Sequence, residues 1–147
     1  MTEIAEAQRI RAALDQRWSP WRKLSVAIET LAAYVRVRWL LVRHDLRETV
    51  VVLHTEKTSD ASGLSEQLVG IRLGRGVMRT LRVVPTDSRC LMRSLVLLKL
   101  LTRRGIDGQL VIGVRSGPPF EAHAWIETGG LPLLPDGGDR YERFLEL

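Results

Sequence analysis

The chain has 147 residues, one cysteine, a formal net charge of +5 at pH 7 and only 5% aromatic residues. This length suits one domain, or one domain with an N-terminal appendage, and suffices to bury a hydrophobic core. A single cysteine excludes an internal disulfide and a multi-cysteine zinc site, and it fits a reducing compartment. Because the first residues lack the basic and then apolar order of a secretory signal, we expect a cytoplasmic protein.

The basic excess is compatible with an acidic peptide, a protein partner or nucleic acid. The sequence has no zinc finger, RNA-binding signature or basic stripe interleaved with aromatics, so we expect no nucleic-acid partner. Residues 24–42 approach the length of a membrane span. Glu29, Arg36 and Arg38 interrupt this apolar run, which favours a helix outside the membrane.

The first half of the chain is expected to be helical. Apolar residues recur at helical spacing over residues 4–18, and Ser19 followed by Pro20 is a typical helix start. A long amphipathic helix is predicted next, because apolar residues recur every three to four positions: Leu24, Ile28, Leu31, Val35 and Trp39. The apolar run at residues 50–53 is too short for periodicity to distinguish a strand from a buried helix.

The polar segment at residues 57–63 predicts a loop and the place of any domain boundary. We therefore expect a helical N-terminal region at residues 1–60 and a core at residues 61–147, or one continuous domain. A further helix is expected over residues 65–78, capped near Ser62 or Ser65. Its glycines Gly70, Gly74 and Gly76 weaken this prediction, since each costs up to about 1 kcal/mol relative to alanine.

The second half has stronger signals. A helix is predicted from about Arg89, capped by Thr86 or Asp87, buried on nearly every side by its leucines and ended by Gly105. Strands are expected over residues 109–114, 122–128 and 131–134, and a tight glycine turn joins the last two. This order predicts an α+β fold in which a buried helix packs on an antiparallel sheet.

Two residues in this second half are candidates for catalysis. Cys90 falls in the first turn of the predicted helix, where the partial positive charge favours a thiolate. His123 follows on a strand, on one face with Trp125 and Glu127. An imidazole beside the thiolate can act as base and then as acid. From the residues alone, an inert buried cysteine and an ordinary strand histidine remain alternatives.

A carboxylate follows at hairpin distance. If the strand at residues 131–134 pairs with that at residues 122–128, Asp136 comes level with His123 and can accept a hydrogen bond from its ring. Asp139 could do the same. The ligand pairs that usually hold zinc are missing, so we expect no metal. Gly74-Arg75-Gly76 lacks the lysine and the strand-to-helix context of a phosphate loop, so we expect no cofactor either.

Several segments together resemble a known family: residues 87–98, 103–107, 111–115, 119–120 and 122–127. They are similar to the leader peptidase of lasso-peptide biosynthesis, the protease half of the B protein, which has a transglutaminase-like, papain-like fold. The similarity runs from about Pro85 to the last residue. It implies a triad in which Cys90 is the nucleophile, His123 the general base and acid, and Asp136 the residue that orients the imidazole.

The resemblance also implies a reaction and partners. The reaction is hydrolysis of the bond between leader and core of a ribosomally made precursor, through a thioester. The implied partners are the precursor peptide, a separate leader-binding protein and an ATP-dependent macrolactam synthetase. The basic N-terminal helices would dock the leader and its binding protein, or would only complete the core. The alternatives are a transglutaminase-like amidase or acyl transferase and a non-catalytic basic adaptor that binds peptide or nucleic acid.

Overall fold

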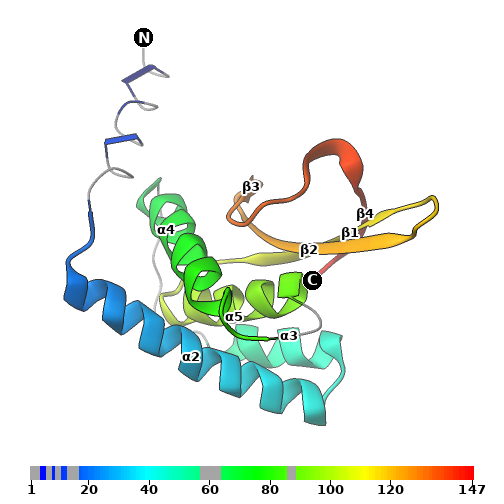
Figure 1. The fold of residues 1–147 in the computed structure, drawn as a ribbon, viewed down its shortest axis with the longest axis horizontal. Helices are drawn as coiled ribbons and strands as arrows, with labels where there is room; N and C mark the ends of the chain where they lie inside the picture. Colours follow the sequence, from blue (N-terminus) through cyan, green and yellow to red (C-terminus); the bar gives the residue numbers. More distant parts are fainter. Residues whose placement is uncertain (1–3, 6–7, 9–10, 13–16, 57–63, 86–88) are drawn as a thin grey trace.

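Helices precede a small sheet in the computed structural model (Figure 1), which describes residues 4–5, 8, 11–12, 17–56, 64–85 and 89–147. The helices are α2 (Pro20–Arg43), α3 (Leu46–Thr55), α4 (Leu64–Leu81) and α5 (Arg89–Arg103). The strands are β1 (Gln109–Arg115), β2 (Glu121–Thr128), β3 (Leu131–Pro132) and β4 (Glu142–Glu146), with a short 3-10 helix η1 (Gly138–Arg140) before β4. The predicted α+β fold is confirmed.

The sheet is antiparallel and has the order β3-β2-β1-β4. The turn between β2 and β3 is formed by Gly129 and Gly130, whose φ angles are 57° and 79°, as a two-residue hairpin of this kind requires. The predicted third strand is shorter than expected, because pairing with β2 ends at Pro132. The sequence did not predict β4, a mostly exposed edge strand without an apolar run.

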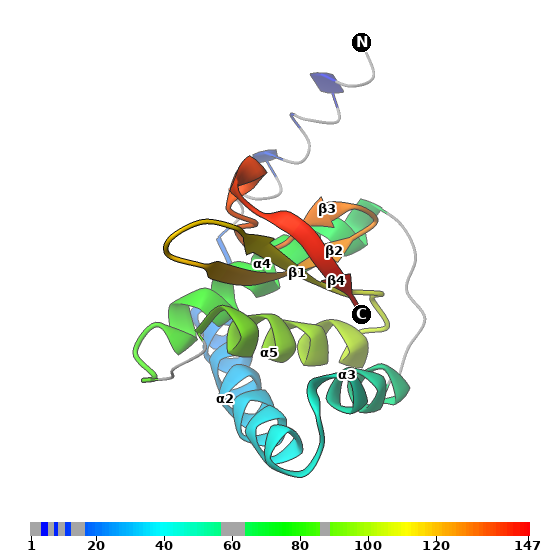
Figure 2. The ribbon, with the colours of Figure 1, turned by 90° about the vertical axis from the view of Figure 1, so that its right-hand side faces the viewer.

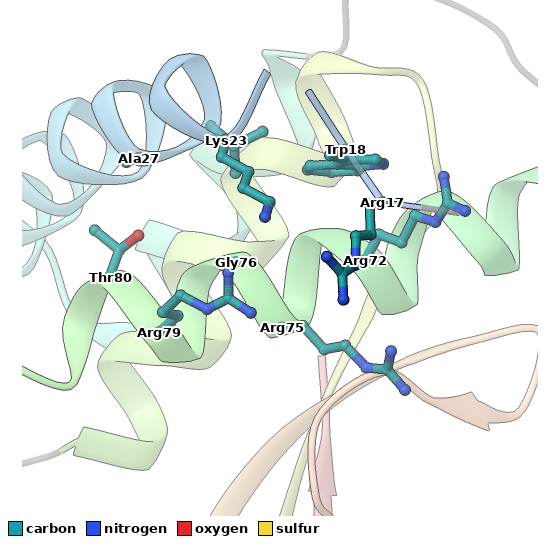
Figure 3. A pocket seen from close by; sticks show the side chains of 10 residues that line it. Arg17, Trp18, Lys23, Ala27, Arg72, Arg75, Gly76, Arg79 and Thr80 are labelled. Atoms are coloured by element: carbon teal, nitrogen blue, oxygen red, sulfur yellow. The ribbon is translucent and has the colours of Figure 1, made fainter. Parts of the chain in front are cut away.

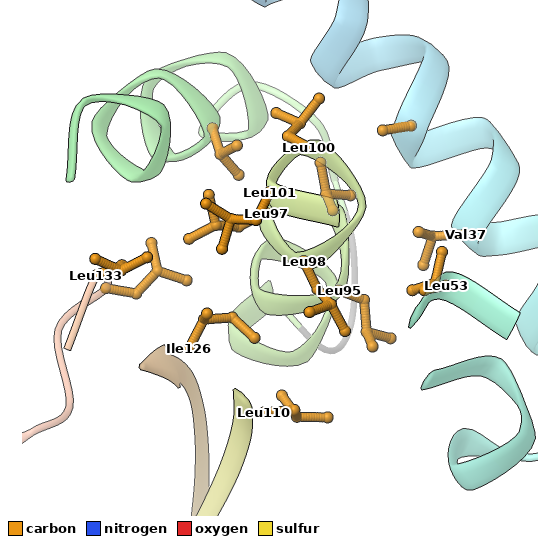
Figure 4. Close-up of a cluster of buried hydrophobic side chains, with 14 of the residues drawn as sticks. Val37, Leu53, Leu95, Leu97, Leu98, Leu100, Leu101, Leu110, Ile126 and Leu133 are labelled. Carbon is orange, nitrogen blue, oxygen red and sulfur yellow. The ribbon is translucent and has the colours of Figure 1, made fainter. Parts of the chain in front are cut away.

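Helix α5 forms the centre of the molecule. It contacts α2, α3 and α4 on one side and β1 and β2 on the other (Figures 1 and 2). Leucines from several of its sides are at most 1% exposed, and Figure 4 shows them pointing toward the other helices and the sheet. The prediction of a helix buried on nearly every side is confirmed. Its end is confirmed as well, since Gly105 follows it with a φ of 71°.

Side-chain caps define two of the helix starts. The Ser19 hydroxyl accepts from the Arg22 amide at 3.3 Å before Pro20, as predicted. Asp45 and Glu48 form a capping box, which starts α3 and makes residues 50–53 helical instead of extended. The predicted caps at Thr86, Asp87 and Ser62, the Ser65 side chain and most of the predicted helix over residues 4–18 lie outside what the structure describes.

The length of α2 confirms the predicted long helix, but its apolar stripe faces outward. Val35 and Ile28 are 67% and 60% exposed, whereas the inward face consists of Val26, Thr30, Ala33, Val37 and Leu40. A count of apolar residues does not single out this face, because the outward face is apolar as well and the inward face includes the polar Thr30. Its hydroxyl can be buried because it donates to the Val26 carbonyl at 2.6 Å. Neither α2 nor another helix in the described ranges is long and apolar enough to cross a membrane.

The glycines of α4 mark close contacts. A Cβ atom at Gly70 would lie 2.7 Å from a methyl carbon of Leu133, and one at Gly74 would collide with the Leu133 carbonyl oxygen. These glycines weaken the helix on propensity alone but let the chain after β3 pack directly against it. The helix forms in spite of them and runs to Leu81, past the predicted residue 78.

Candidate active site

Cys90 is the second residue of α5, so its predicted place in the first turn is confirmed. The thiol is free and half-buried, and it packs against the edge of the hydrophobic core. The Ser94 hydroxyl donates to the Cys90 carbonyl at 2.8 Å, one turn along the helix. The residue therefore stands on a packed helix and is still partly accessible to solvent.

The ends of α5 and β2 indicate where His123 lies relative to Cys90. The Thr128 hydroxyl, at the end of β2, donates to the Asp107 carbonyl at 3.1 Å, just beyond the end of α5. Going back from there, β2 reaches His123 after about 17 Å and α5 reaches Cys90 after about 20 Å. In both views the first turn of α5 lies on the side toward which the β1–β2 hairpin projects (Figures 1 and 2). Cys90 and His123 thus occupy the same end of the fold.

Strand alternation separates the two faces of β2. Ile126 points into the core between the sheet and α5, close to Leu98 (Figure 4), and Ala124 shares its face. His123 shares the other face with Trp125 and Glu127. Among the described residues no hydrogen bond joins the Cys90 thiol to the His123 ring, although both lie at the same end of the fold.

Two aromatic rings hold the imidazole of His123. The Trp125 ring stacks on it with centroids 5.9 Å apart, and the Tyr141 ring is tilted against it at 5.3 Å. Its Nε2 atom lies 2.6 Å from the carbonyl oxygen of Pro135. Since a carbonyl oxygen only accepts, Nε2 carries the proton. In the neutral ring Nδ1 is then the acceptor, the form that a general base needs.

Asp136 is the next residue, but its carboxylate has another partner. Asp136 Oδ1 accepts from the Gly138 amide at 2.9 Å, which closes a turn in which Gly137 and Gly138 have positive φ angles. The structure brings Asp136 into the neighbourhood of His123 through Pro135, and the hydrogen bond to the ring comes from the main chain. The side chain of Asp139 lies outside what the structure describes. In the described ranges no three His, Cys, Asp or Glu side chains gather as metal ligands.

Comparison with known proteins identifies the family of this chain. The model of the transglutaminase-like superfamily matches residues 24–147. The chain belongs to this superfamily. The matched range includes the buried helix with Cys90 in its first turn and the antiparallel sheet with His123 on its second strand.

A curated relative matches a shorter stretch of this transglutaminase-like chain. Over 43 residues the chain is 51% identical to the microcin J25-processing protein McjB of Escherichia coli. This stretch is 29% of the present chain and 20% of McjB, so most of that protein has no counterpart in the match. No solved structure matches the chain.

An ion pair between the buried Glu127 and the half-exposed Arg143 supports the Trp125 ring that stacks on His123 in this transglutaminase-like chain. Glu127 is 4% exposed, and its Oε1 atom accepts from the Trp125 indole at 2.9 Å and from the Arg143 guanidinium at 2.6 Å. The pKa of Arg143 is raised by its hydrogen bonds to Glu146 and Glu127. Burial of the Glu127 carboxylate is therefore compensated, and the indole that stacks on His123 is fixed in place.

Sequence reasoning missed three parts of this site: the Pro135 carbonyl, Tyr141 and Arg143. The last two reach the site only because β4 and the residue before it lie beside β1. No pattern in the residues indicated β4. A main-chain carbonyl leaves no trace in a sequence, so no signal could have revealed the acceptor for His123.

Proposed function

We propose that this transglutaminase-like protein is a cysteine peptidase that hydrolyses the bond between leader and core of a lasso-peptide precursor. Cys90 is the nucleophile, His123 the general base and acid, and Asp136 the supporting carboxylate. The observation that carries the proposal is the Nε2 hydrogen bond to Pro135, which leaves Nδ1 of His123 as the proton acceptor. The similarity to McjB, whose name is microcin J25-processing protein, supports the substrate class.

The reaction follows from these groups. His123 Nδ1 takes the thiol proton, and Sγ of Cys90 attacks the scissile carbonyl. The tetrahedral intermediate collapses, the C–N bond breaks, and the imidazolium gives its proton to the leaving amine, which becomes the N-terminus of the core. His123 then removes a proton from water, which attacks the thioester and releases the leader as a carboxylic acid. The thiolate is reprotonated, and the free enzyme returns.

Negative charge develops on the carbonyl oxygen in both steps. The amide of Cys90, at the start of α5, is the natural donor to this oxygen, because N–H groups in the first turn of a helix have no partner within it. Loss of one such donor typically lowers turnover about 100- to 1000-fold. For attack, His123 approaches the thiol to hydrogen-bond distance, a contact that tightens when substrate binds.

The outward face of α2 is the surface on which we expect a partner protein to bind. The outward stripe of α2 includes Trp21 and Val42 at 80% and 84% exposure, so it presents apolar area along the whole helix. We assign this stripe to the separate leader-binding protein that the family resemblance implies. Positive charge borders it, since Arg36 and Arg43 stack on Trp39 at 5.0 and 4.6 Å. The released core would then pass to the macrolactam synthetase.

The test uses the purified chain, a leader-binding protein and a precursor peptide, with products weighed by mass spectrometry. Wild type should cut one bond, and Cys90→Ala and His123→Ala should not. His54→Ala is the matched control, because His54 is an exposed histidine on α3, and it should cut like wild type. A new amide in place of a free carboxylate would indicate an acyl transferase. Equal cleavage by wild type and Cys90→Ala would contradict the proposal.

A further inference from the structure

A basic pocket lies between α2 and α4, away from Cys90 and His123. Its volume is about 260 Å³, and Val26, Ala27, Gly76 and Thr80 form its floor and sides. Figure 3 shows side chains of both helices and of the segment before α2 around this space. Five of the lining residues are cations and one is a tryptophan: Arg17, Lys23, Arg72, Arg75, Arg79 and Trp18.

No ion pair with a carboxylate of the described residues joins any of these five cations. Elsewhere, Arg104 pairs with Glu29 at 3.0 Å and Arg115 with Glu121 at 3.0 Å. Among the described residues that line the pocket, none is acidic. Five like charges around one small space repel one another, so an anion in that space would relieve the repulsion.

Arg72 shows where such an anion would bind. Its Nε and Nη2 atoms are buried and have no hydrogen-bond partner, and its guanidinium lies 5.9 Å from the centre of the Trp18 ring. A buried donor without a partner is costly, and two on one guanidinium are unusual. The Nε and Nη2 atoms form the edge of the guanidinium that binds two oxygens of a carboxylate or phosphate side by side.

We propose that this pocket binds a small phosphate-bearing molecule, with one phosphate held on the Nε and Nη2 edge of Arg72. Arg75 and Arg79 follow Arg72 at helical spacing and line the same space, so they supply further charge. Five cations suit a group that carries about two negative charges at pH 7 better than a single carboxylate. The pocket is small and only partly open to solvent, which suits a small molecule better than an extended chain.

The pocket is independent of the proposed peptidase activity. It shares no lining residue with the site around Cys90 and His123, and its walls are the two helices that pack on α5. A ligand that bridges α2 and α4 binds the folded chain and not the unfolded one, so it raises the unfolding temperature as its concentration increases.

The test is titration calorimetry and thermal unfolding of the full chain with pyrophosphate as the probe, at constant ionic strength. We expect saturable binding to one site with a Kd below about 1 mM and an unfolding temperature that rises with pyrophosphate. The double variant Arg75→Gln/Arg79→Gln removes two exposed charges from the pocket and should weaken binding at least about tenfold. Arg72→Ala should abolish binding. If Arg72→Ala does not fold, the double variant tests the proposal in its place.

Arg47→Gln is the matched control, because Arg47 is exposed on α3 and outside the pocket. It should bind pyrophosphate like wild type. An equal loss of pyrophosphate affinity in Arg47→Gln and in the double variant would mean that binding depends only on the net charge of the chain, and it would overturn the proposal. Tighter binding of a tetra-aspartate peptide than of pyrophosphate would also overturn it, because the pocket would then recognise acidic peptide.

Discussion

The main-chain carbonyl of Leu133 packs against the α carbon of Gly74, in the space where any other residue would begin its side chain. Two residues later the same segment presents the Pro135 carbonyl to Nε2 of His123 at 2.6 Å. The bare surface of α4 at Gly74 thus determines how closely this segment approaches the helix. In this way Gly74, a glycine of α4, helps to position His123, the candidate base.

Gly74→Ala should therefore lower both stability and turnover. The new methyl group meets main chain that cannot rotate away, and overpacking of this kind outweighs the gain in helix propensity, for a net loss of about 1–2 kcal/mol. Gly70→Ala is the control, because its methyl group meets the end of the flexible Leu133 side chain and should be nearly neutral. Urea unfolding of the two variants checks the order, and a larger loss for Gly70→Ala would contradict it.

Asp136→Asn should separate the two roles of this residue. The amide oxygen can still accept from the Gly138 amide, so stability should remain close to that of wild type. Loss of the charge should lower kcat by about 10- to 100-fold if the carboxylate supports the imidazolium of His123. Steady-state kinetics beside thermal unfolding measure both effects. Unchanged kcat would mean that the Pro135 carbonyl alone orients the ring.

Glu56 should make the stability of the protein depend on pH. It accepts hydrogen bonds from Arg36 of α2 at 2.9 Å and from Lys99 of α5. Burial raises the pKa of the Glu56 carboxyl, but the hydrogen bonds and charges of Lys99 and Arg36 outweigh it, so the pKa lies below its ordinary value of 4.5. A lowered pKa contributes stability above pH 4.5 that is lost as the pH falls through the folded-state value.

Glu56→Gln removes this dependence. At pH 7 the variant should be less stable than wild type by about 1 kcal/mol, since the pairs are partly exposed and screened by solvent. The difference should shrink as the pH is lowered below 4.5, because the wild-type carboxyl then protonates. Chemical unfolding at several pH values gives both curves. A constant difference across this range would contradict the assigned role of the carboxylate.

Two valines on α2 provide a test of which face is buried. Val37 is 0% exposed and Val35 is 67% exposed, so Val37→Ala should cost about 2 kcal/mol and Val35→Ala less than about 0.5 kcal/mol. Both variants lose the same two methyl groups from the same helix, which makes each the control for the other. The order of their urea unfolding midpoints shows which of the two valines is buried. Val35→Ala should instead weaken binding of the leader-binding protein.

The sequence predicted the elements that local signals define. Ser19 with Pro20 predicted the start of α2, and Gly105 predicted the end of α5, because caps and left-handed glycines act over a few residues. The inward face of α2 could not be predicted from its apolar residues, since both faces of that helix are apolar and only tertiary contact with α4 and α5 selects one.

The candidate site could likewise be predicted only in part from the sequence. The place of Cys90 in the first turn of its helix and the β2–β3 hairpin that brings Asp136 close to His123 follow from local pattern. The acceptor for the His123 ring does not, because it depends on how the chain after β3 packs against α4. The triad roles of Cys90, His123 and Asp136 stay predictions that the variants above test.

The central position of α5 has a consequence for hydrogen exchange. Beyond its first turn its amides are hydrogen-bonded within the helix and lie between the other helices and the sheet, so we expect them to exchange only when the whole molecule unfolds. The segment that presents the Pro135 carbonyl is bounded by glycine turns at Gly129-Gly130 and Gly137-Gly138, and its amides should exchange through local opening. The body of the helix that carries the thiol is thus as stable as the fold itself, and we expect the larger fluctuations of the site on the side that holds the imidazole.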